Sequence, residues 1–172
     1  MMKIIGRLFG PKLPRTDSGF SLIEMLIVIV VIGIIATIAV SRFVGATKSA
    51  NEASAVSGIK LMIGAESGYQ GGSTAATLAQ LRSSNAIDEG FAEIDGGDPD
   101  TLKRSGYIFK ITTSGTQYVI SAIPASTGVV GSGRRRFGAD NTGVLFTDSV
   151  TIDTHFITNE DLRSGTAVTF EE

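Results

Sequence analysis

One carboxylate stands at the edge of the most apolar stretch of the sequence. Glu24 is followed, from Met25 to Val40, by a run that contains no charged residue. A charged side chain inside a membrane span costs about 2.5–3.5 kcal/mol at the helix centre and less near an end, so such a residue is a candidate for function. No Lys or Arg lies within one helical turn of Glu24. Its partner must therefore come from elsewhere.

Cleavage of the chain would supply such a partner. A cut between Gly19 and Phe20 would create an α-amino group one helical turn before Glu24. That amine could pair with Glu24 of the same chain or of a neighbouring chain. A carboxylate in the first turn is also stabilised by the positive end of the helix dipole.

The element that positions Glu24 is a predicted membrane-spanning helix at residues 20–40. About 20 apolar residues cross a hydrocarbon core of about 30 Å at 1.5 Å per residue. A single span must be helical because lipid offers no partners for backbone N–H and C=O groups. Residues 1–19, a basic leader, carry a net charge of +3, and since the whole chain carries −2 the remainder carries −5. This asymmetry places the N-terminus in the cytoplasm and the rest outside. The net negative charge of the remainder argues against nucleic acid as a partner.

The arrangement of Gly19, Phe20 and Glu24 before the span resembles the N-terminal signal of type IV pilins and of the pseudopilins of type II secretion. The resemblance implies cleavage between Gly19 and Phe20 by prepilin peptidase and N-methylation of Phe20. It also implies an assembly role for Glu24, which would meet the Phe20 amine of an adjacent subunit. The partners implied are other copies of the chain or other pilins, the inner-membrane assembly platform, and membrane lipid.

Two plainer interpretations of the apolar run remain open. The run could be a simple membrane anchor whose Glu24 reaches the interface. It could also be a secretory signal peptide, which is cut after its apolar region. Residues 39–43, at the end of the run, form a poor cleavage site for a secretory signal peptidase, and the run is long for a signal peptide. A pilin-type peptidase instead cuts before the run and keeps it.

Residues 41–70 are predicted to continue the same helix as an amphipathic half. Four residues recur on one face at helical intervals and are followed by Ile59 and Ile63; they are Phe43, Ala46, Ala50 and Ala53. Residues 71–172 are predicted to form a globular α+β head. With 21 Gly and 4 Pro the chain suits loops and strands rather than a helix bundle. The predicted fold is a pilin-like ladle, with one long helix whose second half packs on a small antiparallel sheet.

The head pattern divides into short segments. Gly71-Gly72 ends the long helix, and Ser73 or Thr74 caps a short helix from Ala75 to about Asn85. An acidic loop at 88–105 is followed by a hairpin whose strands cover 107–111 and 117–123 around a turn at 112–116. Further strands are expected at 134–137 and 144–146, with a turn between them at 139–143. Residues 150–172 are expected to form an appended strand or arm.

The rest of the sequence offers little for catalysis. The chain has no Cys and a single His, His155. This excludes thiolate sites and most histidine-based catalytic or zinc arrangements, so we expect no enzyme, no cofactor and no metal. Oxygen-rich residues near the C-terminus leave calcium in the head open; they are Asp140, Asn141, Asp148 and Asp153. The basic triplet 134–136 predicts either outward arginines that are solvated or paired with acidic loops, or a subunit or DNA contact.

Three functions therefore compete. The first is a structural subunit of a type IV pilus, for adhesion, motility or DNA uptake, stored in the bacterial inner membrane and then polymerised at the cell surface. The second is a type II secretion pseudopilin. The third is a membrane-anchored enzyme or ligand-binding domain, for which the chain offers no catalytic constellation.

Overall fold

The computed structural model describes residues 19–69, 74–87, 90–93, 98, 100–148, 155–164 and 168–170. The chain divides into two compact units, Met1–Ala39 and Val40–Glu172. The helical elements are α1 (Leu22–Gly68), α2 (Leu78–Ser83) and α3 (Asn159–Ser164). The strands are β1 (Ala92–Glu93), β2 (Thr101–Arg104), β3 (Tyr107–Ser114), β4 (Gln117–Pro124), β5 (Arg136–Asp140), β6 (Leu145–Asp148) and β7 (Val168–Thr169).

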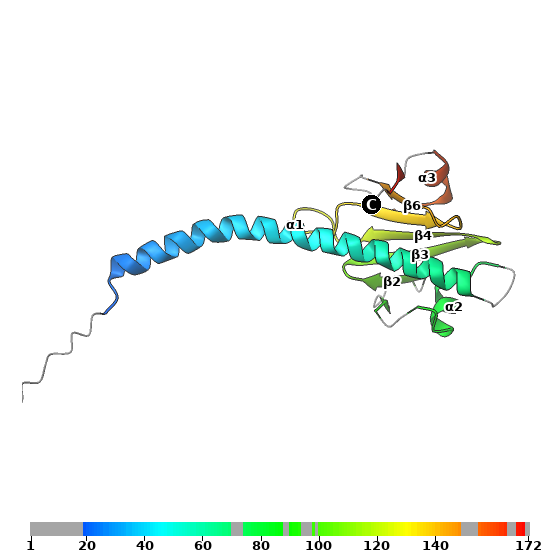
Figure 1. Cartoon of the computed structure of the whole chain (residues 1–172), viewed down its shortest axis with the longest axis horizontal. Helices are drawn as coiled ribbons and strands as arrows, with labels where there is room; N and C mark the ends of the chain where they lie inside the picture. The colour runs from blue at the N-terminus through cyan, green and yellow to red at the C-terminus, as the bar shows by residue number, and fades with distance from the viewer. Residues whose placement is uncertain are drawn as a thin grey trace, which may run out of the picture. The chain divides into compact units, whose positions relative to one another are not determined.

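The strands form one antiparallel sheet in which each strand pairs with its neighbour in sequence, in the order β1-β2-β3-β4-β5-β6-β7. A long helix and an antiparallel sheet confirm the predicted α+β fold class. Within the second unit, the C-terminal part of α1 lies along one face of this sheet (Figure 1).

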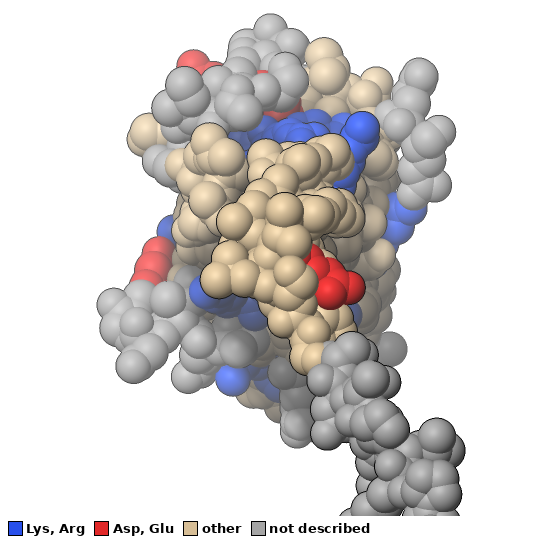
Figure 2. Space-filling model, turned by 90° about the vertical axis from the view of Figure 1, so that its left-hand side faces the viewer, with Lys and Arg blue, Asp and Glu red and all other residues tan. Residues whose placement is uncertain are grey.

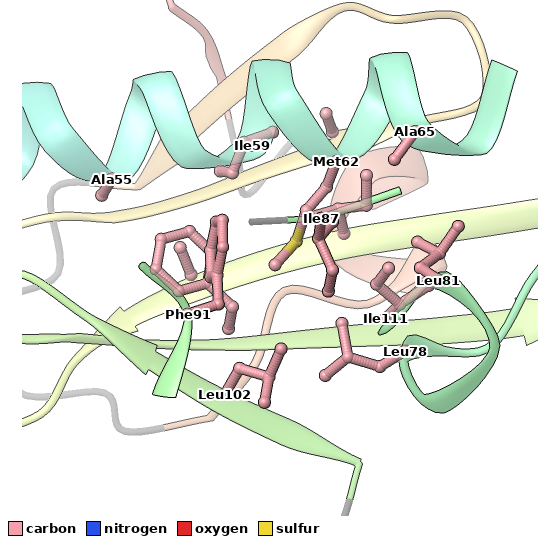
Figure 3. Packing of buried hydrophobic residues seen from close by; sticks show 14 of the residues in the cluster. Ala55, Ile59, Met62, Ala65, Leu78, Leu81, Ile87, Phe91, Leu102 and Ile111 are labelled. Atoms are coloured by element: carbon pink, nitrogen blue, oxygen red, sulfur yellow. The ribbon is translucent and has the colours of Figure 1, made fainter. Parts of the chain in front are cut away.

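The main core lies between α1 and the sheet. Ala55, Ile59, Met62 and Ala65 point from the helix towards buried side chains of the sheet and of the segment that contains α2 (Figure 3). Phe109 of β3 is fully buried, and its ring meets that of Phe91 edge-on at 5.1 Å between centroids. The first half of the predicted apolar face does not contribute to this core, because Phe43, Ala46, Ala50 and Ala53 are exposed.

The second face of the sheet is covered near β4. Ser121 is buried there, and its hydroxyl accepts a hydrogen bond of 2.8 Å from the backbone N–H of Ile157. Ile157 also packs on Gly138, where an added Cβ would lie 3.1 Å from its side chain. Within the expected appended strand or arm, Phe156 and Ile157 form an irregular segment that covers the sheet, α3 follows it, and Val168–Thr169 forms strand β7. Residues 150–152 lie outside the described residues.

Several helices and strands begin or end at residues other than those predicted. The hairpin is confirmed, but both strands are longer, and its turn shrinks to Gly115-Thr116. The short helix begins at Leu78 because Thr77 and Gln80 form a reciprocal capping box, so Thr74 does not cap it. Ser73 lies outside the described residues. Gly71-Gly72 lies outside the described residues.

Strand β2 was missed in the segment predicted to be an acidic loop. It is joined to β3 by Ser105 and Gly106, both at positive φ, as a tight two-residue hairpin requires. The third predicted strand begins later, at Arg136, because Arg134 and Arg135 bind Glu52 of α1 instead of continuing the strand. Ala139 and Asp140 belong to that strand, and β6 begins at Leu145.

Candidate processing and assembly site

The first candidate residues lie at the start of α1. Helix α1 begins at Leu22, and its first turn is closed by a 3.2 Å hydrogen bond from the Met25 N–H to the Ser21 carbonyl. Gly19 and Phe20 precede the helix. A Cβ added to Gly19 would meet nothing within 4 Å, and Phe20 is 75% exposed. The bond between Gly19 and Phe20 therefore lies in an accessible, non-helical segment, as a peptidase substrate requires.

Glu24 lies in the first turn of α1. The first N–H groups of a helix have no partner within the helix, and they place partial positive charge at this end. Glu24 is exposed, so its carboxylate is open to a partner on another molecule. Phe20 and Glu24 are four residues apart in the sequence, with Phe20 before the helix and Glu24 in its first turn.

The helix that follows presents apolar side chains on all sides. Every residue from Phe20 to Phe43 is exposed, including the large aliphatic side chains of the whole run. The surface of this segment is tan in Figure 2, with the red of an acidic side chain on it. Thr37, the one hydroxyl residue between Met25 and Val40, donates to the carbonyl of Gly33 at 2.9 Å. The run from Met25 to Val40 therefore satisfies its one side-chain hydroxyl within the helix, as lipid demands.

Among the described residues, α1 is the one helix long and apolar enough to cross a membrane. A buried core helix or a signal sequence can meet the same criteria of length and composition. None of the apolar stretch that meets these criteria is buried in the structure, so this segment is not a core helix of the fold. An exposed apolar helix of this length needs lipid or other protein around it.

Comparison with known families identifies a motif in the same segment. The model of the prokaryotic N-terminal methylation motif matches residues 14–40. The chain carries this methylation motif. The motif is the signature of type IV pilins and pseudopilins, and it covers the leader end, Glu24 and the apolar run. It indicates a pilin-type structural subunit in general rather than an enzyme. Neither a curated protein nor a solved structure matches the chain.

A second group of polar residues, which the sequence did not reveal, joins α1 to the head. The carboxylate of Glu52, on α1, accepts hydrogen bonds from the backbone N–H of Arg134 at 2.8 Å and from the guanidinium of Arg135 at 2.9 and 3.1 Å. The Arg135 guanidinium also lies over the rings of Phe137 and Phe170, 5.3 and 5.4 Å from their centroids. Glu52 is separated from these arginines by more than 80 residues, so no local pattern could indicate the contact.

The predicted basic triplet is therefore not one surface patch. Arg136 is buried and binds Asp148 at 2.6 Å, with a further bond from its Nη1 to the His155 carbonyl at 2.9 Å. Arg135 is partly covered by Glu52 and the aromatic rings, and Arg134 is exposed. The hypothesis of outward arginines is wrong for Arg136, because a guanidinium paired with a carboxylate can be buried between strands.

A shallow hollow beside the Glu52–Arg135 ion pair is a candidate for a small-ligand site. It lies between α1 and the end of the chain, and Lys60, Arg135, Phe137 and Phe170 contribute to its lining. Glu52 already neutralises Arg135 there, and the two rings cover the guanidinium face. Because the charge of Arg135 is already paired with that of Glu52, the hollow gives the ligand-binding interpretation no specific support.

The acidic residues considered for calcium have other roles where they are described. Asp148 pairs with Arg136, and Asp140 accepts a 2.9 Å bond from the Thr142 N–H, which shapes the turn before β6. Asp153 lies outside the described residues. No group of three or more His, Cys, Asp or Glu residues that could hold a metal ion occurs within the described part of the chain. Calcium in the head stays a prediction.

Proposed function

We propose that this protein is a structural subunit of a type IV pilus. It is made as a prepilin in the bacterial inner membrane with its N-terminus in the cytoplasm. Prepilin peptidase cuts between Gly19 and Phe20, the new terminus is methylated, and the assembly platform polymerises the subunits through α1 into a surface filament. The filament would serve adhesion, motility or DNA uptake.

One observation carries this proposal. The methylation motif coincides with a helix whose apolar residues are exposed on every side. Before assembly, lipid would surround that helix. In a filament, the same surface would be covered by the helices of other subunits, and the Phe20 amine of one subunit would neutralise Glu24 of the next.

The first test is the intact mass and N-terminal sequence of the protein recovered from the cell surface. A chain that starts at N-methylated Phe20 supports the pilin pathway. A start near residue 40 would indicate an ordinary signal peptide, and an uncut Met1 a simple anchor. Either of the latter results would overturn the proposal.

The second test addresses Glu24. Glu24→Ala should leave a stable membrane protein but greatly reduce the yield of sheared filaments, because the uncompensated amine of the neighbour remains. Glu160→Ala, which removes an exposed carboxylate of α3 on the head, is the matched control and should assemble normally. Normal filament yield from Glu24→Ala would refute the assembly role.

The alternative is a type II secretion pseudopilin, because the methylation motif is shared by both classes. Deletion of the gene distinguishes them. Loss of long extracellular filaments favours the pilus, whereas a secretion defect in cells that show no filaments favours the pseudopilus.

A further inference from the structure

Three large apolar side chains are exposed at one end of the second unit. Phe43 of α1 is 74% exposed, and Val129 and Val130 are 87% and 82% exposed. The two valines lie in the loop between β4 and β5, residues 125–135, called here the β4–β5 loop. Phe43 and Val130 line one shallow hollow with Val44, Thr47 and Gly131. We call Phe43, Val129 and Val130 the valine patch.

The loop that carries the valines is fixed to α1. The Nζ of Lys48 donates to the Gly128 carbonyl at 2.6 Å, and the amide nitrogen of Asn51 donates to the Ser132 carbonyl at 2.8 Å. Glu52 accepts the Arg134 N–H as described above. Lys48 is only 6% exposed, and burial of an ammonium group is costly unless its bonds are made. These bonds explain why charged residues occupy this face of α1.

The loop is also closed on itself. The Gly131 N–H donates to the Gly128 carbonyl at 3.1 Å, and the Ser132 N–H donates to the Ser126 carbonyl at 2.9 Å. Gly128 has φ +97°, and a Cβ on Gly131 would lie 2.6 Å from the Ser126 carbonyl oxygen. The valines are therefore presented outwards by a loop with a fixed conformation, rather than left exposed by lack of structure.

Phe43, the patch residue on α1, lies directly after the proposed membrane span in the sequence. Phe43 follows Val40, the end of the apolar run, by three residues, which is about 5 Å along a helix. The charges on this part of the molecule are basic. Residues 25–51 and 125–135 contain no Asp or Glu. Arg42 and Arg134 are exposed, and Arg134 reaches to 3.8 Å from the Cβ position of Gly45.

We propose that the valine patch is a second membrane contact, in which Val129 and Val130 enter the boundary between headgroups and acyl chains. Apolar side chains next to arginines suit this boundary, because the former enter the acyl region while the latter meet anionic headgroups. The contact would hold the second unit against the outer face of the bilayer until the subunit is extracted for assembly. The inference rests on the proposed membrane span.

The absence of Cys from the chain makes a direct test straightforward. Single cysteines are introduced into the full-length chain, labelled with an environment-sensitive fluorophore and reconstituted in vesicles of phosphatidylethanolamine and phosphatidylglycerol. Val130→Cys reports the patch. Ile32→Cys, within the span, reports membrane insertion. Thr116→Cys is the matched control on another exposed turn.

The control position is remote from the patch within the second unit. The turn at Gly115 binds the Ala75 N–H, and the next residue, Ala76, donates to Glu66 of α1. Glu66 lies 18 residues beyond Lys48, which is about 27 Å along the helix. The label at Thr116 should therefore stay in water when the patch enters the bilayer.

We expect brominated acyl chains to quench the label at Val130 and at Ile32 but not at Thr116. Quenching at Ile32 without quenching at Val130 would overturn the inference and leave the proposed span intact. Loss of quenching at Ile32 would instead overturn the span, and the inference with it. A label at Val130 that responds to protein density in the vesicle, and not to brominated lipid, would show that a second copy covers the patch and would also overturn the inference.

Discussion

Two glycines of α1, Gly58 and Gly64, allow the energetic cost of a clash between helix and sheet to be separated from the change in helix propensity. Replacement of Gly by Ala inside a helix stabilises it by about 1 kcal/mol. At Gly64 an added Cβ would meet nothing within 4 Å. Gly64→Ala should therefore raise the free energy of unfolding by up to about 1 kcal/mol.

The same change at Gly58 meets the core. The new Cβ would lie 2.8 Å from Cζ of Phe109 and 3.3 Å from Cζ of Phe91, where contacts between carbon atoms are favourable at about 3.5–4.0 Å. The two rings are buried and hold each other edge-on, so neither can move without disturbing the other. Overpacking of this kind costs about 1–3 kcal/mol.

Since both variants gain the same helix propensity, their difference isolates the clash. We expect Gly58→Ala to be less stable than Gly64→Ala by about 1–3 kcal/mol. Urea unfolding of the full chain in mild detergent, followed by tyrosine fluorescence and circular dichroism, measures both. Equal stability of the two variants would refute the packing of Gly58 on the aromatic pair.

Two further predictions concern charged groups of the head. Burial raises the pKa of Glu66 above its usual value, and the hydrogen bond from the Ala76 N–H only partly opposes this rise. The folded state therefore binds the proton more tightly than the unfolded chain does. As a result, the free energy of unfolding falls as the pH rises from about 4.5 through the folded pKa. Glu66→Gln should remove this loss of stability, so the urea midpoint should be higher at pH 7 and change little below pH 4.5. A lower midpoint at pH 7 would contradict the prediction. Asp148→Asn should destabilise the fold by about 3–5 kcal/mol, because it leaves the buried guanidinium of Arg136 without its counter-charge. If the same assay shows a loss of unfolding free energy below about 1 kcal/mol, the pair is not buried in solution.

The sequence predicted those features whose signal is local. The apolar run gave the long helix, and the alternation around Ser114-Gly115 gave the central hairpin. The missed strand β2 contains one large apolar residue, Leu102, among polar ones, and only the Ser105-Gly106 turn could have indicated it. Its position depends on pairing with β3, which a single segment does not reveal.

The face of α1 next to the β4–β5 loop shows a different limit. An apolar face was expected at Phe43, Ala46 and Ala50, but the buried residues of this stretch are Lys48 and Glu52. They are buried because distant loop carbonyls, N–H groups and Arg135 satisfy their charges. Periodicity of apolar residues cannot show such a contact, since the partners lie about 80 residues further along the chain.

The order of the sheet has a consequence for how the head could form. Every strand pairs with the strand next to it in sequence, through antiparallel neighbours only. Loop closure is inexpensive for such near-neighbour pairs, and structures with short sequence separations between contacts fold faster than those with long ones. A chain emerging across a membrane from its N-terminal end could therefore add strands one after another as they appear. The long-range step is the docking of α1, which would already be present when the first hairpin closes.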